Sequence, residues 1–244
     1  MMTSSQTSSG KDTEIITQIE KNHSDIQLEI KSAAASAGRN PDEVLLVAVS
    51  KMVGIPEIQD AIKAGINDFA ENRSPVLLEK QNAIPGVQWH FIGHIQTNKL
   101  KDVVGRTHLI HSVATEHALE TIGRLAQKQG ICQSMLVEVN VSGEASKDGM
   151  SASEVPSFLE SVCNTQGVEV KGLMTMAPVT YSAEDESARR SFSALRELRD
   201  NLVPVFAGAE NISLNELSMG MSDDFTDAIQ EGATIVRIGR RLWS

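Results

Sequence analysis

Lys51 stands where a lysine can form a covalent bond with a carbonyl compound. It follows the apolar, β-branched run Val44–Val49, with only Ser50 between them, and Gly54 comes soon after. A short run of this kind predicts a buried strand, and a lysine at its carboxyl end points into the crevice where α/β folds build their sites. A partly desolvated amine there can lose its proton and form a Schiff base. Considered alone, the same lysine is more often an ordinary surface residue after a strand.

Residues at the ends of the last two predicted strands indicate a second feature, a phosphate site. Ser218 offers a hydroxyl, Gly239 lets backbone N–H groups approach an anion closely, and Arg240 adds a charge or a backbone donor. Barrel enzymes often bind phosphate between the loops after strands seven and eight. Taken singly, Gly239 could be a simple turn glycine. A phosphate site across from a Schiff-base lysine nevertheless predicts pyridoxal 5′-phosphate (PLP), a phosphorylated aldehyde, as the cofactor.

Strand and helix signals alternate along the chain in the manner of a (β/α)8 barrel. The predicted strands are the segment ending at Ser50, Ile66–Ala70, Val87–Ile92, His108–Val113, Ser134–Val141, Val168–Met174, Ile212–Leu217 and Thr234–Ile238. A helix over about Asp12–Ala37 comes first, and its isoleucines share one face: Ile15, Ile19, Ile26 and Ile30. We therefore expect a single TIM-like (β/α)8 barrel over residues 12–244 with an extra N-terminal helix, and a disordered Ser/Thr-rich tail over residues 1–11.

Several residues outside the expected site have simpler structural interpretations. A polar helix is predicted from Thr97, and a short helix is predicted over Asp223–Gln230 with Ser222 as its N-cap. His90 alternates into the sheet and is expected to be a packed core histidine. The methionines, Met219 among them, are expected mostly to fill gaps in the barrel.

The composition favours a cytoplasmic protein that binds small molecules. Lys and Arg number 22 against 32 Asp and Glu, so the formal net charge of −10 argues against a nucleic-acid partner. The two cysteines, Cys132 and Cys163, have no close metal-ligand spacing and do not suggest a disulfide framework, which fits a reducing compartment. No stretch approaches the roughly 20 apolar residues of a membrane span. We therefore expect no metal, no nucleic acid and no membrane among its ligands and partners.

Seven stretches of the chain carry a more specific signal when they are taken together. They are Val47–Lys51, Phe69–Arg73, Trp89–Lys99, Val139–Glu144, Gly172–Met176, Leu217–Asp224 and Val236–Gly239. The chain resembles the pyridoxal phosphate homeostasis proteins, relatives of the N-terminal barrel of bacterial alanine racemase. The matching residues extend over about Val44–Leu242, nearly the whole predicted barrel.

This resemblance implies a particular set of cofactor contacts. PLP would form an internal aldimine with Lys51, its phosphate would contact Ser218 and the backbone of Gly239 and Arg240, and Arg237 would lie near the pyridine nitrogen. The same resemblance adds two further contacts to the expected cofactor-binding set, Asn72 and Met219. Arg240 replaces the Thr or Ser that is common in the family, so its guanidinium or backbone N–H would take the place of a hydroxyl.

We expect a carrier rather than an enzyme. A cation such as Arg237 beside the pyridine nitrogen disfavours its protonation and weakens the ring as an electron sink. A racemase also needs a second acid or base, which an additional C-terminal domain supplies in the racemases and which is not expected here. The predicted function is intracellular vitamin B6 homeostasis by a monomer that buffers PLP and passes it to apo forms of PLP-dependent enzymes. The alternatives are a small amino-acid racemase that uses Lys51 and an unidentified base, and a barrel that binds another phosphorylated metabolite.

Overall fold

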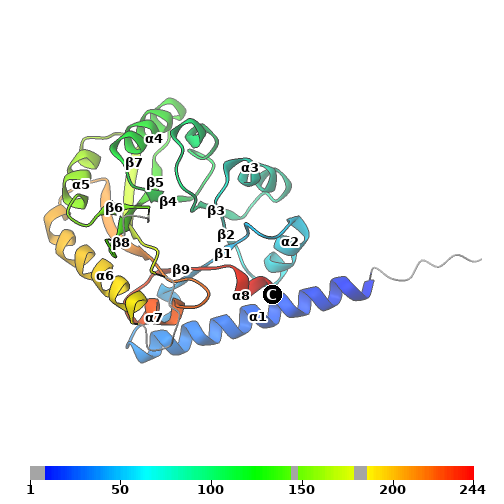
Figure 1. Ribbon diagram of the computed structural model, residues 1–244. Helices are drawn as coiled ribbons and strands as arrows, with labels where there is room; N and C mark the ends of the chain where they lie inside the picture. The colour runs from blue at the N-terminus through cyan, green and yellow to red at the C-terminus, as the bar shows by residue number, and fades with distance from the viewer. Residues whose placement is uncertain (1–8, 144–147, 179–185) are drawn as a thin grey trace, which may run out of the picture.

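Eight parallel strands close into a barrel, which confirms the predicted fold (Figure 1). The computed structural model describes residues 9–143, 148–178 and 186–244, with side chains from residue 18 onward. The barrel strands are β1 (Leu45–Val49), β2 (Asp68–Glu71), β3 (Gln88–Phe91), β4 (Leu109–Val113), β5 (Gln133–Asn140), β7 (Val168–Met174), β8 (Ile212–Ser218) and β9 (Ile235–Ile238). Neighbouring strands pair in parallel, and the pairing of β4 with β5 closes the ring.

A short additional strand, β6 (Met150–Ser151), was not predicted. It pairs with Val139 and Asn140 at the carboxyl end of β5. Gly149 comes just before it with φ +105°, and a Cβ there would lie 2.7 Å from the Asn140 backbone nitrogen. Two residues are too few to show an apolar alternation, so this pairing is decided by the close approach of two chain segments.

Helices surround the barrel and follow its strands in turn (Figure 1). They are α2 (Ile55–Lys63), α3 (Ser74–Ala83), the 3-10 helix η2 (Thr97–Asp102), α4 (Glu116–Gln129), α5 (Val155–Cys163), α6 (Ser187–Phe206), α7 (Phe225–Gln230) and α8 (Arg240–Trp243), and a further 3-10 turn, η1 (Pro41–Glu43), precedes β1. The polar helix predicted from Thr97 is therefore only a 3-10 segment. Leu100 is its one buried residue, so the segment has too little apolar surface to hold a longer helix against the barrel.

The predicted N-terminal helix is present as α1 (Ser9–Ser36) and lies along the outside of α2, α7 and α8 (Figure 1). Its buried isoleucines are Ile19, Ile26 and Ile30, as the periodicity predicts. The Asn22 amide donates to the carbonyl oxygens of Leu242 (3.1 Å) and Ser244 (2.8 Å), so α1 binds the end of the chain. Of the expected tail, residues 1–8 lie outside the described part, as does the side chain of Ile15, and residues 9–11 begin α1.

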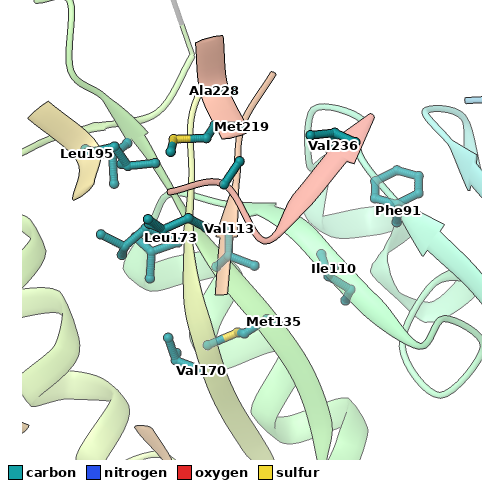
Figure 2. Close-up of a cluster of buried hydrophobic side chains, with 14 of the residues drawn as sticks. Phe91, Ile110, Val113, Met135, Val170, Leu173, Leu195, Met219, Ala228 and Val236 are labelled. Atoms are coloured by element: carbon teal, nitrogen blue, oxygen red, sulfur yellow. The ribbon is translucent and has the colours of Figure 1, made fainter. Parts of the chain in front are cut away.

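Two buried layers lie on opposite faces of the barrel strands. The outer cluster joins strand residues to helix residues, and Figure 2 shows part of it, including Leu173, Leu195 and Ala228. The inner cluster contains strand residues only: Val47, Val49, Ala70, Leu109, Leu136, Met174 and Ile235. Because side chains alternate along a strand, these residues identify which positions face the barrel axis.

Two further findings concern the helices and the cysteines. Among the described residues, no helix combines the length and apolar character needed to cross a membrane. Cys132 and Cys163 are both free thiols on the surface.

Candidate functional site

The alternation of inner and outer side chains brings Lys51 and Arg237 to the same side of neighbouring strands. Val47 and Val49 face the barrel axis, so Lys51 continues the inward phase just beyond β1. On β9, Ile235 faces the axis and Arg237 is the next inward position, directly opposite Val47 in the register. Lys51 is exposed at the carboxyl end of the barrel, whereas Arg237 is only 4% exposed.

Arg237 is a buried cation held by neutral acceptors. Its Nη1 donates to Ser218 Oγ at 2.8 Å, and its Nη2 donates to the Thr175 carbonyl oxygen at 3.0 Å. Burial lowers the pKa of Arg237 to about 10, while Asp224 and Glu138 act in the opposite direction. The guanidinium therefore stays charged at neutral pH and can donate hydrogen bonds to an electron-rich atom of a ligand.

Ser218 is fully buried at the end of β8, and its hydroxyl faces other protein side chains. Besides accepting from Arg237, its Oγ lies 2.9 Å from His111 Nδ1. Both partners are interior residues. Ser218, the predicted phosphate contact, is therefore hydrogen-bonded to Arg237 in the structure.

Ser222 is a candidate that the sequence interpretation missed. Its Oγ accepts from the backbone N–H groups of Gly239 (3.3 Å) and Arg241 (3.5 Å) at the start of α8. The prediction that Ser222 caps the helix after it is wrong, because Asp224 occupies the N-cap of α7 and its Oδ1 accepts from the Met221 N–H. A hydroxyl beside converging N–H groups is a donor set that suits a phosphate.

Arg240 and Met219 direct their side chains away from this donor set. The Arg240 guanidinium forms an exposed ion pair with Asp223, so its backbone N–H is the group available to an anion beside Gly239. The Met219 side chain belongs to the outer cluster with Leu195 and Ala228 (Figure 2). Met219 can therefore contribute to the inner face through its backbone only.

Asn72 follows β2 at the inward phase set by Ala70, and the chain is tightly packed there. A Cβ on Gly93 would lie 2.0 Å from the Asn72 carbonyl oxygen. Only glycine therefore allows the segment after β3 to lie this close to the backbone of Asn72. Asn72 also lines a cavity of about 440 Å³ beside the barrel mouth, together with Arg73 and His94. The predicted residue is thus at the same end of the barrel as Lys51.

A buried ion pair supports the segment that carries Lys51, and the sequence interpretation did not find it. Lys80 Nζ lies 2.5 Å from Glu71 Oε1 and donates to the Ser50 carbonyl oxygen at 2.7 Å. The Ser50 hydroxyl donates to the same Glu71 oxygen at 2.7 Å. The residue before Lys51 is therefore held by both its backbone and its side chain.

Glu138 adds a titratable group to the interior. It lies on β5 at the inward phase of Leu136 and is 4% exposed. Burial raises the pKa of Glu138 to about 7, and Asp148 adds to the rise, while Arg237 and His94 oppose it. A carboxyl group that titrates near neutrality beside a buried cation is a candidate acid or base. A charged residue in the middle of an apolar strand was the available sequence signal.

Comparison with known proteins identifies the family of this chain. Residues 25–243 match the family described as the alanine racemase N-terminal domain. Two proteins named pyridoxal phosphate homeostasis protein are similar over most of their length. The one from Aquifex aeolicus is 40% identical over 88% of this chain and 92% of its own, and the one from Pseudomonas aeruginosa is 37% identical over 92% and 94%. The chain belongs to this family of pyridoxal phosphate homeostasis proteins, within the alanine racemase N-terminal-domain fold.

Solved structures of similar proteins have the same architecture. An unknown protein from Bifidobacterium adolescentis has a TM-score of 0.85 at 31% identity, and the match covers 94% of this chain and 96% of its own. PipY of Synechococcus elongatus, solved with PLP bound, has a TM-score of 0.76 at 31% identity over 88% of this chain and all of its own. Alanine racemase from Clostridium difficile shares the fold at 15% identity, with a TM-score of 0.74, and 56% of its chain is covered. The barrel of this chain thus has the same fold as the barrel of alanine racemase.

Proposed function

We propose that this protein binds PLP at the carboxyl end of its barrel, with the cofactor aldehyde attached covalently to Lys51 Nζ. The observation that carries the proposal is the shared inner face of Lys51 and the buried cation Arg237. The names of the relatives and the PLP-bound structure of PipY support the same ligand. A bound PLP would supply an aldehyde that combines reversibly with an amine.

The donor set fits the three chemical parts of PLP. Lys51 offers an amine to the aldehyde, and the start of α8 offers the N–H groups of Gly239 and Arg240 to the phosphate. Ser222 lies beside those groups. Ser218, which the family resemblance implies as a phosphate contact, is hydrogen-bonded to Arg237 and is proposed to act on the cofactor through that residue. Arg237 offers N–H donors toward the pyridine nitrogen. Asn72 and the Met219 backbone complete the proposed set.

We propose that the protein buffers PLP and transfers it to apo-enzymes in the cytoplasm, acting as a monomer and not as an enzyme. Arg237 keeps a positive charge in the interior, and such a charge disfavours a protonated, electron-withdrawing pyridine ring. Two free surface thiols fit a reducing compartment. Sedimentation of the purified protein tests the monomer, and PLP transfer to an apo-transaminase tests the carrier.

Covalent attachment is tested by borohydride reduction followed by peptide mass mapping. We expect a pyridoxyl group on the peptide that contains Lys51, and we expect Lys51→Ala to lose both this mass and the visible absorbance band. The matched control is Lys101→Ala, which removes an exposed lysine from η2. A Lys51→Ala protein that kept the band would overturn the assignment.

A small racemase is the second candidate, and Glu138 is the observation that favours it. Its carboxyl group lies in the interior, and burial brings its pKa to about 7, which suits an acid or base at neutral pH. Incubation with L-alanine in deuterium oxide separates the two functions. Rapid α-deuteration with formation of D-alanine, lost in Lys51→Ala and in Glu138→Gln, would favour the racemase. We expect slow PLP release and an unchanged amino acid.

A further inference from the structure

A continuous chain of side-chain hydrogen bonds crosses the barrel interior from Arg237 to Asp68. Arg237 Nη1 is 2.8 Å from Ser218 Oγ, and this oxygen is 2.9 Å from His111 Nδ1. His111 Nε2 is 2.9 Å from His90 Nδ1, and His90 Nε2 is 3.2 Å from Asp68 Oδ1. Each member comes from a different strand: β9, β8, β4, β3 and β2. Asp68 is the first residue of β2, so the chain reaches the amino-terminal end of the barrel.

The proton positions in this chain follow from its two ends. Arg237 can only donate, and an ionised Asp68 can only accept. If both histidines are neutral, His90 must carry its proton on Nε2 to reach Asp68, and His111 must carry its proton on Nε2 to reach His90. The Ser218 hydroxyl then donates to His111 Nδ1. Every donor therefore points away from Arg237 and toward Asp68.

Burial supports the neutral form of both histidines. His90 and His111 have no exposed surface, and burial lowers the pKa of each, that of His111 well below its usual value. Hydrogen bonds aligned in one direction place a lone pair of Ser218 against the Arg237 cation and a carboxylate at the far end. Such an arrangement stabilises a buried cation without placing a carboxylate in direct contact with it.

We propose that His111, His90 and Asp68 are positioning residues for Arg237, acting through Ser218. The chain holds the guanidinium in place and directs its remaining N–H donors to the pyridine-nitrogen end of the PLP site, a role that rests on the function proposed above. The electronic environment of the cofactor is thus set in part from the opposite end of the barrel. A cavity of about 550 Å³ lies at that end of the barrel, and its lining residues include His90, His108 and Lys171.

The test uses three variants and one control. His111→Phe removes both hydrogen bonds of that ring, while His111→Asn keeps an oxygen that can accept from the Ser218 hydroxyl. Asp68→Asn removes the terminal charge but keeps an acceptor for His90. His108→Asn is the matched control, because the His108 ring lies against His90 at 5.5 Å between centroids without belonging to the chain.

We expect His111→Phe to weaken PLP binding about tenfold, which is the loss expected for about one hydrogen bond. The same variant should shift the absorbance maximum of the bound cofactor. His111→Asn should retain affinity within about threefold, Asp68→Asn should fall between the two, and His108→Asn should match the wild-type protein. Unchanged affinity and spectrum in His111→Phe would overturn the proposal. If that variant does not fold, unchanged affinity and an unchanged spectrum in Asp68→Asn would overturn it.

A second measurement on the PLP-free protein separates this proposal from the proposed function. Nitrogen-15 NMR of labelled histidine should find His90 and His111 both protonated on Nε2, and exchange of the Arg237 guanidinium protons should quicken in His111→Phe. A wild-type protein that bound no PLP would refute the proposed function, whereas a protonated Nδ1 on either histidine would refute the hydrogen-bond chain.

Discussion

The outer and inner faces of the barrel strands are built from different kinds of residue. The outer cluster is an apolar layer between strands and helices, as in Figure 2. The inner face has a small apolar cluster and, among it, buried polar groups: His90, His111, Glu138, Ser218 and Arg237. Barrel interiors are more often filled by branched aliphatic side chains. The difference indicates that the outer layer stabilises the fold, while the interior gives up apolar packing for a binding site.

The largest expected effect is the removal of a large side chain from the outer layer. Phe192 on α6 is fully buried, so Phe192→Ala should lower the free energy of unfolding by about 3–5 kcal/mol. Urea unfolding measures the loss, and PLP titration of the folded variant should give an unchanged dissociation constant. A loss of PLP affinity in proportion to the loss of stability would contradict the separation of the two layers.

The ion pair of Lys80 and Glu71 is a second place where polar groups replace apolar packing. Both charged groups are buried beside the segment that carries Lys51. Lys80→Met should cost about 3 kcal/mol of stability, since it leaves the Glu71 carboxylate buried without its cation. The double variant Lys80→Met, Glu71→Met should recover part of this loss. Thermal and urea unfolding of the wild-type protein and both variants measure these changes. Equal stabilities of all three proteins would show that the pair contributes nothing.

The buried carboxyl group of Glu138 should make the stability of the protein depend on pH. Its pKa is about 7 in the folded protein, against a usual value of 4.5, so the folded state keeps a proton that the unfolded state loses between these values. The free energy of unfolding should therefore fall by about 2.5 kcal/mol as pH rises from 5 to 8. Each pH unit between the two pKa values is worth roughly 1.4 kcal/mol, and this window covers most of that range. Glu138→Gln should lack this decrease. Urea unfolding of both proteins at the two pH values isolates it, and identical slopes would contradict the shift.

The smallest expected effects distinguish the two serines. Ser218→Ala and Ser222→Ala should each weaken PLP binding roughly tenfold, about 1.4 kcal/mol. Because Ser222 lies beside the N–H groups of α8 and Ser218 beside Arg237, Ser222→Ala should leave the affinity for pyridoxal, which lacks the phosphate, unchanged. Ser218→Ala should weaken the binding of both compounds. Fluorescence titration with each ligand measures this, and the reverse pattern would make Ser218 the phosphate contact.

Much of the barrel could be predicted from the sequence because its signals are local. Short apolar runs identified the eight barrel strands, and the isoleucines at helical spacing identified α1. Lys51 and Arg237 could be placed at strand ends for the same reason. The segment from Thr97 was predicted as a helix but is a short 3-10 segment, and the two-residue β6 was missed, since neither has enough residues to show a period.

The side-chain partners inside the site were decided only by the tertiary structure. Ser218 and His111 are 107 residues apart, and Lys80 and Ser50 are 30 apart, so no local pattern could have paired them. Ser222 looked like a helix cap because its neighbours Asp223 and Asp224 suit a helix start, yet the folded chain brings it to Gly239. Periodicity determines which face of an element is buried, whereas closure of the barrel determines which polar groups meet on that face.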